Sequence, residues 1–234
     1  MKPSSTARAA VEAFKVTIPV LFGYLAIGIA FGIMLETSGY PWYLAAIMSI
    51  FIYAGALEYM AVSFLVSSTP MVEIAIMSFL VNFRHIVYGL SLFNQVNRAR
   101  RFKPYVIFAL TDETYALLTT IHYPPRINRE KYTFFIALFD HCYWVIGSVL
   151  GALAGSLIPF DSKGIDFALT ALFIVLLIEQ WKNSDSKLPF AIALIAGVAA
   201  MVIDKSNMLL IAVLLASAAL LLLRRRIEHA NVHD

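Results

Sequence analysis

Long apolar runs separated by short polar links dominate the chain, and they predict helices that cross a lipid bilayer. The runs lie at about residues 16–35, 42–66, 71–93, 105–121, 132–158, 165–181, 188–203 and 208–223. A bilayer core about 30 Å thick needs about 20 apolar residues per helix, and most of these runs approach that length. The pattern predicts an all-α polytopic membrane protein with about seven or eight transmembrane segments, some short or broken.

Composition agrees with this interpretation. The chain has 234 residues, of which 60% are hydrophobic and 14% charged, whereas a soluble domain has about 25% charged residues. The single cysteine, Cys142, cannot form an internal disulfide. The sequence has no ATP-binding loop and no zinc-protease or serine-hydrolase motif. We therefore expect neither an enzyme of those classes nor a cofactor or metal site.

Basic residues gather beside the apolar runs, which is typical of topology signals and not of a nucleic-acid-binding surface. The clusters lie at residues 2–15, 98–103, 126–131 and 224–226. The first cluster predicts a cytoplasmic N-terminus. If every run crosses once, however, the cluster at 98–103 falls on the wrong side. A re-entrant segment at 105–121 would bring this cluster to the cytoplasmic side only if one earlier run also does not cross the membrane once. The sequence does not decide which run that is.

Glycine spacing suggests a weak internal repeat. Gly28 and Gly32 are followed by Glu58, and 123 residues later Gly151 and Gly155 are followed by Glu179. Glycines four residues apart predict close helix packing. Repeats of this kind build many transporters, although a match of so few residues also arises by chance.

Polar residues inside the run 71–93 are the most informative feature of the chain. Asn82, Arg84, His85 and Tyr88 would spread around a continuous helix, where lipid cannot satisfy them all. We therefore expect the segment to break or bend near Asn82 and to expose backbone N–H groups to a cavity. The alternative is that Arg84 only holds the bundle together by pairing with an acid.

Other runs contain acids. Glu58 lies some 12 Å below the membrane boundary, at about 1.5 Å per residue, and either carries a proton or pairs with Arg84. Asp112 and Glu113 diverge by about 100° on a helix, so either one of them faces a cavity or both form an acid cluster at a helix N-terminus. Asp140 and His141 suit a proton relay or a hydrogen-bonded core pair.

Three motifs together resemble the AzlC family of branched-chain amino-acid exporters. They are Tyr53-Ala54-Gly55-Ala56-Leu57-Glu58-Tyr59, the run from Val81 through Asn82-Phe83-Arg84-His85 to Leu92, and Leu110-Thr111-Asp112-Glu113-Thr114. The resemblance implies that residues 1–234 form a single integral membrane transport domain in the bacterial cytoplasmic membrane. It also implies export of valine, leucine and isoleucine together with a small hydrophobic AzlD-type subunit. Glu58 stands where the family usually has glutamine.

The resemblance and the residues together predict a site for a zwitterion with an apolar side chain. Arg84, with Asn82, His85 and Tyr88 beside it, would bind the carboxylate, and Glu58 or Asp112 would receive the ammonium group. Tyr53, Tyr59 and Phe83 are candidates for the apolar wall. Proton antiport would drive export, with Glu58, Asp112, Glu113, Asp140 and His141 as the candidate coupling groups. The alternative is a membrane scaffold or sensor that transports nothing and whose buried charges hold helices together.

Overall fold

A computed structural model describes residues 5–67, 69–121, 123–125, 127–157, 174, 177–178, 181, 187–204 and 208–230. These residues form helices and connecting turns without a β-strand, which confirms the all-α class. The chain divides into two compact units, one of residues 1–70 and 81–165 and one of residues 71–80 and 166–234. Most of the run predicted at 165–181, including Glu179 of the suggested repeat, lies outside the described residues.

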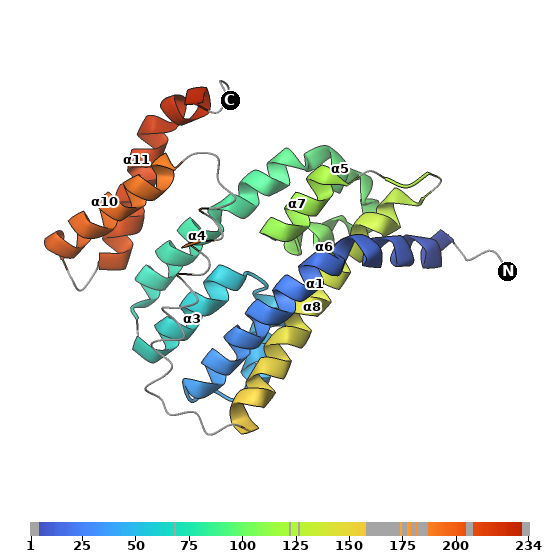
Figure 1. Cartoon of the computed structure of the whole chain (residues 1–234), viewed down its shortest axis with the longest axis horizontal. Helices are drawn as coiled ribbons and strands as arrows, with labels where there is room; N and C mark the ends of the chain where they lie inside the picture. The colour runs from blue at the N-terminus through green and yellow to red at the C-terminus, as the bar shows by residue number, and fades with distance from the viewer. Residues whose placement is uncertain are drawn as a thin grey trace. The chain divides into compact units, whose positions relative to one another are not determined.

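The described residues form ten α-helices and one 3₁₀ turn (Figure 1). They are α1 (Ser5–Thr37), α2 (Trp42–Phe51), α3 (Gly55–Ser67), α4 (Met71–Ser91), α5 (Phe93–Arg98), η1 (Arg100–Phe102), α6 (Lys103–Phe108), α7 (Asp112–Thr120) and α8 (Arg129–Leu157), followed by α10 (Leu188–Ile203) and α11 (Met208–Ala230). Among the described helices, α1, α4 and α8 are long and apolar enough to cross a membrane. In the second unit, α10 packs against α11.

Helices α1 and α8 lie side by side and run parallel to each other (Figure 1). Thr17 Oγ1 lies 3.0 Å from the Tyr143 hydroxyl, and further along Gly28 faces Ser148, where an added Cβ would lie 3.1 Å from the backbone nitrogen. A Cβ on Gly32 or Gly151 would collide with the backbone of the opposite helix. The glycines therefore allow close backbone approach, as their spacing predicted.

Helices α2 and α3 form a hairpin, which we call the first hairpin. Its tip, residues 52–54, lies beside the middle of α8, because the Tyr53 ring stacks on His141 with centroids 4.2 Å apart. Its open end lies at the C-terminal end of α1, since the hydroxyl of Tyr40, just before α2, donates to the carbonyl of Leu65 near the end of α3 at 3.0 Å. The chain thus enters the unit and returns to the same end.

Helices α6 and α7 form the second hairpin, which enters from the opposite end. Phe102, just before α6, stacks on Phe134 at 4.2 Å, and Tyr123, just after α7, lies 5.8 Å from Tyr132, so both ends lie beside the start of α8. The tip, residues 109–111, lies near the middle of α1, where Thr111 Oγ1 is 2.6 Å from the Tyr24 hydroxyl.

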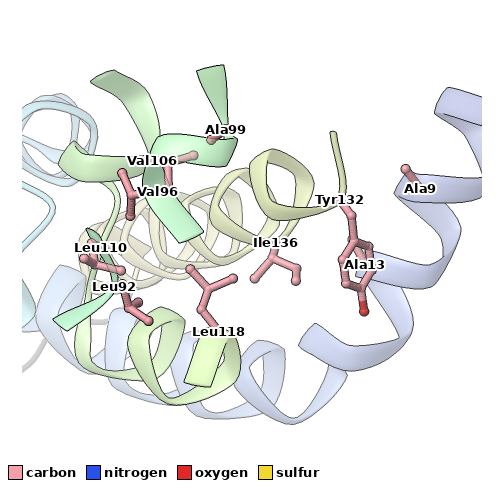
Figure 2. Packing of buried hydrophobic residues seen from close by; sticks show 10 residues of the cluster. All are labelled: Ala9, Ala13, Leu92, Val96, Ala99, Val106, Leu110, Leu118, Tyr132 and Ile136. Carbon is pink, nitrogen blue, oxygen red and sulfur yellow. The ribbon is translucent and has the colours of Figure 1, made fainter. Parts of the chain in front are cut away.

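A hydrophobic cluster packs the second hairpin against the first halves of α1 and α8 (Figure 2). Its buried members come from α1, α5, α6, α7 and α8 and the links between them: Ala9, Ala13, Leu92, Val96, Ala99, Val106, Leu110, Leu118, Tyr132 and Ile136. Burial of these side chains fixes the depth of the hairpin tip, since large apolar side chains stabilise by about 1.5–3 kcal/mol each when fully buried.

The two hairpins remove the conflict with the positive-inside rule. Because each returns to the end from which it entered, the basic residues around Lys103 and Lys131 lie at the same end of the first unit as the start of α1. Lys131 Nζ donates to Thr6 Oγ1, and Arg8 donates to the carbonyl of Pro125 at 3.4 Å. Residues 16–83, which include the first hairpin, contain no lysine or arginine. The runs 42–66 and 105–121 are therefore each a pair of short helices, as expected for short or broken segments.

Candidate functional site

The tip of the first hairpin depends on Glu58. Tyr53 has a left-handed backbone with φ of 45°, which is uncommon for a residue with a side chain. Glu58 is fully buried and accepts hydrogen bonds from the Ala54 N–H (3.2 Å), the Ser49 hydroxyl (3.2 Å) and the Trp144 indole (2.9 Å). The carboxyl group thus joins the end of α2, the start of α3 and the middle of α8. Glu58 is not the partner of Arg84, contrary to one of the two interpretations of the sequence.

The tip of the second hairpin ends in a helix N-terminus. Thr111 is the N-cap of α7, and its hydroxyl accepts from the Thr114 N–H at 3.4 Å. Asp112 and Glu113 occupy the first turn, where the helix dipole favours negative charge. The interpretation of these acids as a helix N-terminal cluster is therefore confirmed.

A cavity of about 160 Å³ lies where the two tips meet α4. Its lining comprises Ile52, Tyr53, Ala54, Asn82, His85, Ile107, Phe108 and Leu110. A cavity of this volume has room for several water molecules or for a small solute. The buried Asn82 Oδ1 has no hydrogen-bond partner among the described residues, so it can accept a hydrogen bond from a ligand.

Helix α4 itself is uninterrupted from Met71 to Ser91, so the break predicted near Asn82 is wrong. The helix contains no proline, and its single glycine, Gly89, follows the polar residues. Asn82 and His85 line the cavity, whereas Arg84 reaches an acid on another element. The backbone therefore opens in the two hairpins and not in α4, and Arg84 finds its partner on the second hairpin.

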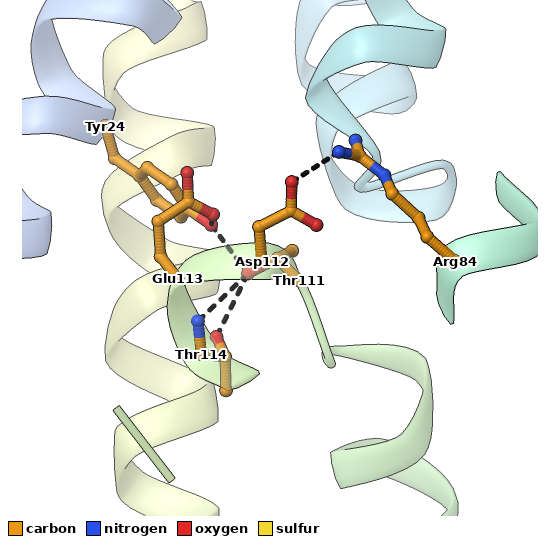
Figure 3. A network of polar contacts seen from close by, with 6 residues as sticks. All are labelled: Tyr24, Arg84, Thr111, Asp112, Glu113 and Thr114. Carbon is orange, nitrogen blue, oxygen red and sulfur yellow. Dashed lines mark hydrogen bonds and ion pairs between the residues drawn. The ribbon is translucent and has the colours of Figure 1, made fainter. Parts of the chain in front are cut away.

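Arg84 forms an ion pair with Asp112 (Figure 3). The pair links α4 to the N-terminus of α7, and the two side chains are 37% and 33% exposed. Tyr88, one helical turn after Arg84, stacks on Tyr115 of α7 with ring centroids 4.5 Å apart. The sequence motif of α4 thus contacts the second hairpin at two levels.

Glu113 diverges from Asp112, as expected for neighbours on a helix, and points toward α1 (Figure 3). The Tyr24 hydroxyl lies 2.6 Å from Glu113 Oε2 and 2.6 Å from Thr111 Oγ1. On the other side of the tip, the Thr114 hydroxyl donates to Asp140 Oδ2 at 2.8 Å. Asp112 and Glu113 therefore belong to separate contacts.

Asp140 and His141 do not form the core pair suggested by their sequence. Asp140 faces α7, whereas His141 Nε2 lies 3.1 Å from the carbonyl of Ser49 and Nδ1 lies 2.9 Å from the Tyr105 hydroxyl. A carbonyl only accepts, so Nε2 carries a proton. His141 therefore joins the two hairpins to α8.

Two predicted wall residues lie away from the cavity lining. Tyr59 is buried and donates to the carbonyl of Ile27 at 2.5 Å, and Phe83 is 50% exposed. Ile107 and Phe108 line the cavity in their place. Tyr24 and the hydroxyls of the Thr-Asp-Glu-Thr run also contribute contacts at the hairpin tip that the sequence did not predict. That run has the composition of a helix start, and its position inside an apolar run was the signal of a second break.

Comparison with known proteins places this architecture in a family. A family model described as "AzlC protein" matches residues 19–158. A Helicobacter pylori protein described as an uncharacterized membrane protein is 40% identical over 175 residues, or 75% of this chain and 77% of that protein. The branched-chain amino acid transport protein AzlC of Bacillus subtilis is 34% identical over 199 residues, or 85% and 78%.

The inner membrane protein YgaZ of Escherichia coli is 28% identical over 211 residues, which cover 86% of this chain and 85% of that protein. No solved structure matches the chain. The family match includes α8 and also both hairpins and α4, which supply the lining of the cavity and the two residues of the ion pair. The chain is a multi-pass membrane protein that belongs to the AzlC family.

Proposed function

We propose that the protein is the large subunit of a secondary transporter that exports branched-chain amino acids through the cytoplasmic membrane by proton antiport. Membership of the AzlC family and the printed name of the Bacillus subtilis relative support a role in amino-acid transport. The cavity between the two hairpin tips carries the proposal. Short helices that meet inside a membrane are a common way to build a substrate site in transporters.

The residues around the cavity match the chemistry of a zwitterion with an apolar side chain. Ile52, Ile107 and Phe108 supply the apolar wall. Arg84 directly precedes the lining residue His85, and Asp112 lies two residues after the lining residue Leu110. When the pair opens, the guanidinium binds the substrate carboxylate and Asp112 binds the ammonium group. The substrate then replaces one ion pair by two, so neither charge remains unpaired.

The basic end of the first unit faces the cytoplasm in this proposal, following the positive-inside rule. The second hairpin then separates the cavity from the cytoplasm, and the first hairpin separates it from the outside. Movement of one tip at a time gives alternating access. The small hydrophobic AzlD-type subunit implied by the family resemblance remains part of the proposal, and its co-purification with this chain is the direct measurement.

Efflux of radiolabelled L-valine from proteoliposomes, with and without a pH gradient, tests the function. Loss of the Arg84 contact in an Arg84→Gln variant removes a charge-assisted hydrogen bond of about 1.5–3 kcal/mol, so we expect valine affinity to fall about tenfold to a hundredfold. Lys15→Gln, which removes an exposed cation paired with Glu12, is the control. A scaffold or sensor would move no valine even in its unaltered form.

The charge-swapped variant Arg84→Asp with Asp112→Arg separates substrate binding from a purely structural ion pair. It keeps an ion pair between α4 and α7 but reverses the positions of the two charges. A structural role predicts that the swap restores the export lost in the single variants, whereas our proposal predicts that export stays low although the protein folds. Export at the normal rate by Arg84→Gln or by the swapped protein would contradict the proposed site.

A further inference from the structure

A continuous series of oxygen contacts joins the carboxyl groups of Glu113 and Asp140. It begins at Glu113 Oε2, passes to the Tyr24 hydroxyl at 2.6 Å and reaches Thr111 Oγ1 at 2.6 Å. From there it continues to Thr114 Oγ1 at 3.1 Å and ends at Asp140 Oδ2 at 2.8 Å. The series connects the tip of the second hairpin to both α1 and α8. Figure 3 shows all of its members except Asp140.

The number of protons in this series is one short if both carboxyl groups are ionised. Four oxygen contacts each require one proton, and the three hydroxyl groups supply three. A proton on either carboxyl fills the fourth contact. The surroundings of Asp140 give a second reason to place a proton on a carboxyl group of the series. Asp140 is 0% exposed, and its Oδ1 has no hydrogen-bond partner among the described residues. An ionised carboxylate that accepts a single hydrogen bond in such a place is costly.

We propose that Tyr24, Thr111 and Thr114 form a proton relay through which Glu113 and Asp140 share one proton. When Asp140 gives its proton to Thr114, the Thr114 hydroxyl passes its own proton to Thr111. Thr111 passes a proton to Tyr24, and Tyr24 passes one to Glu113. At each hydroxyl oxygen one O–H bond breaks and one forms, so the net change is the transfer of one proton between the carboxyl groups.

This relay deepens the proposed proton antiport and rests on it. Glu113 lies beside Asp112 and Arg84, whose ion pair opens in the proposed binding step. Opening of that ion pair changes the charges that face Glu113, whereas Asp140 lies at the far end of the series, beyond Thr114. Substrate binding therefore changes which of the two carboxyl groups holds the shared proton. The other ionisable groups near the Asp140 end are Tyr53, Tyr105, Tyr143 and the neighbouring His141.

Conservative variants test the relay in proteoliposomes that report both labelled L-valine and proton movement. Tyr24→Phe and Thr114→Val each remove one hydroxyl from the series, so we expect proton-driven valine export to fall by about a hundredfold. Exchange of valine for valine moves no net proton and should remain. Thr114→Ser keeps the hydroxyl and should restore coupling. Tyr143→Phe is the matched control, because it removes a buried hydroxyl that bonds only Thr17 in the described hydrogen bonds.

The outcomes separate the relay from the proposed function. Coupled export by the unaltered protein together with normal coupling in Tyr24→Phe would overturn the relay and leave the function intact. If the unaltered protein moves no valine, the proposed function fails, and infrared spectroscopy decides on the relay alone. The carbonyl band of a protonated carboxyl group should shift in Tyr24→Phe and Thr114→Val but not in Tyr143→Phe. An unchanged band in all three variants would overturn the shared proton.

Discussion

Replacement of Glu58 by leucine or glutamine distinguishes a structural acceptor from a proton carrier. In Glu58→Leu, the buried N–H groups of Trp144 and Ala54 lose their acceptor. A buried donor left without a partner costs about 1–3 kcal/mol, so the two together should lower the free energy of unfolding by about 2–6 kcal/mol. The Ser49 hydroxyl adds little, because it can rotate toward another acceptor.

Glutamine preserves this arrangement. Its carbonyl oxygen takes the place of Glu58 Oε1, which accepts from both Trp144 and Ala54, and its NH₂ group faces Ser49 Oγ, which can accept. We therefore expect Glu58→Gln to unfold at nearly the same temperature as the unaltered protein. For a chain of this size about 1 kcal/mol corresponds to about 2–4 °C, so Glu58→Leu should melt at least about 4 °C lower.

Thermal unfolding of the detergent-purified variants, followed by the loss of the monodisperse peak in size-exclusion chromatography, measures the difference. Glu12→Leu, at an exposed ion pair with Lys15, is the control and should change the melting temperature little. If Glu58→Leu melts like the unaltered protein, or Glu58→Gln melts as low as Glu58→Leu, the assignment of Glu58 as the acceptor that holds the first hairpin is wrong. Full proton coupling in Glu58→Gln would further exclude Glu58 as the proton carrier.

Two further predictions concern the fold. Gly32→Ala places a Cβ against the backbone of Ser148 and should destabilise the protein by about 1–3 kcal/mol or more. Gly23→Ala, on the same helix with nothing within 4 Å of the added Cβ, should not, and equal melting temperatures would contradict the close packing of α1 and α8. The re-entrant hairpins predict that single cysteines, introduced after Cys142→Ser, react with a membrane-impermeant maleimide from matching sides of the membrane. Cysteines at Ser38 and Ser67 should react from one side of the membrane, and cysteines at Arg101 and Asn128 should react from the other side. If the cysteines at Ser38 and Ser67 react from opposite sides, the first hairpin is refuted.

The amino-acid sequence determined the class of this protein and indicated the polar residues of its candidate site. Apolar runs of membrane length determine helices, because an unpaired backbone group is too costly in lipid. Glycines four residues apart predicted the packing of α1 against α8, and the cost of a buried guanidinium drew attention to Arg84. These inferences succeeded because each follows from a local property of the chain and the solvent around it.

Only the tertiary structure decided where the backbone opens and which acid pairs with which cation. Tyr53 and Thr111 lie within runs that are apolar enough to be read as single crossings, and the return of each hairpin depends on contacts with α1 and α8. Arg84 had Glu58 and Asp112 as possible partners in the sequence, and it pairs with Asp112 because Trp144, Ser49 and Ala54 surround Glu58. Pairing of this kind depends on which elements meet in space, and residue spacing along one helix does not contain that information.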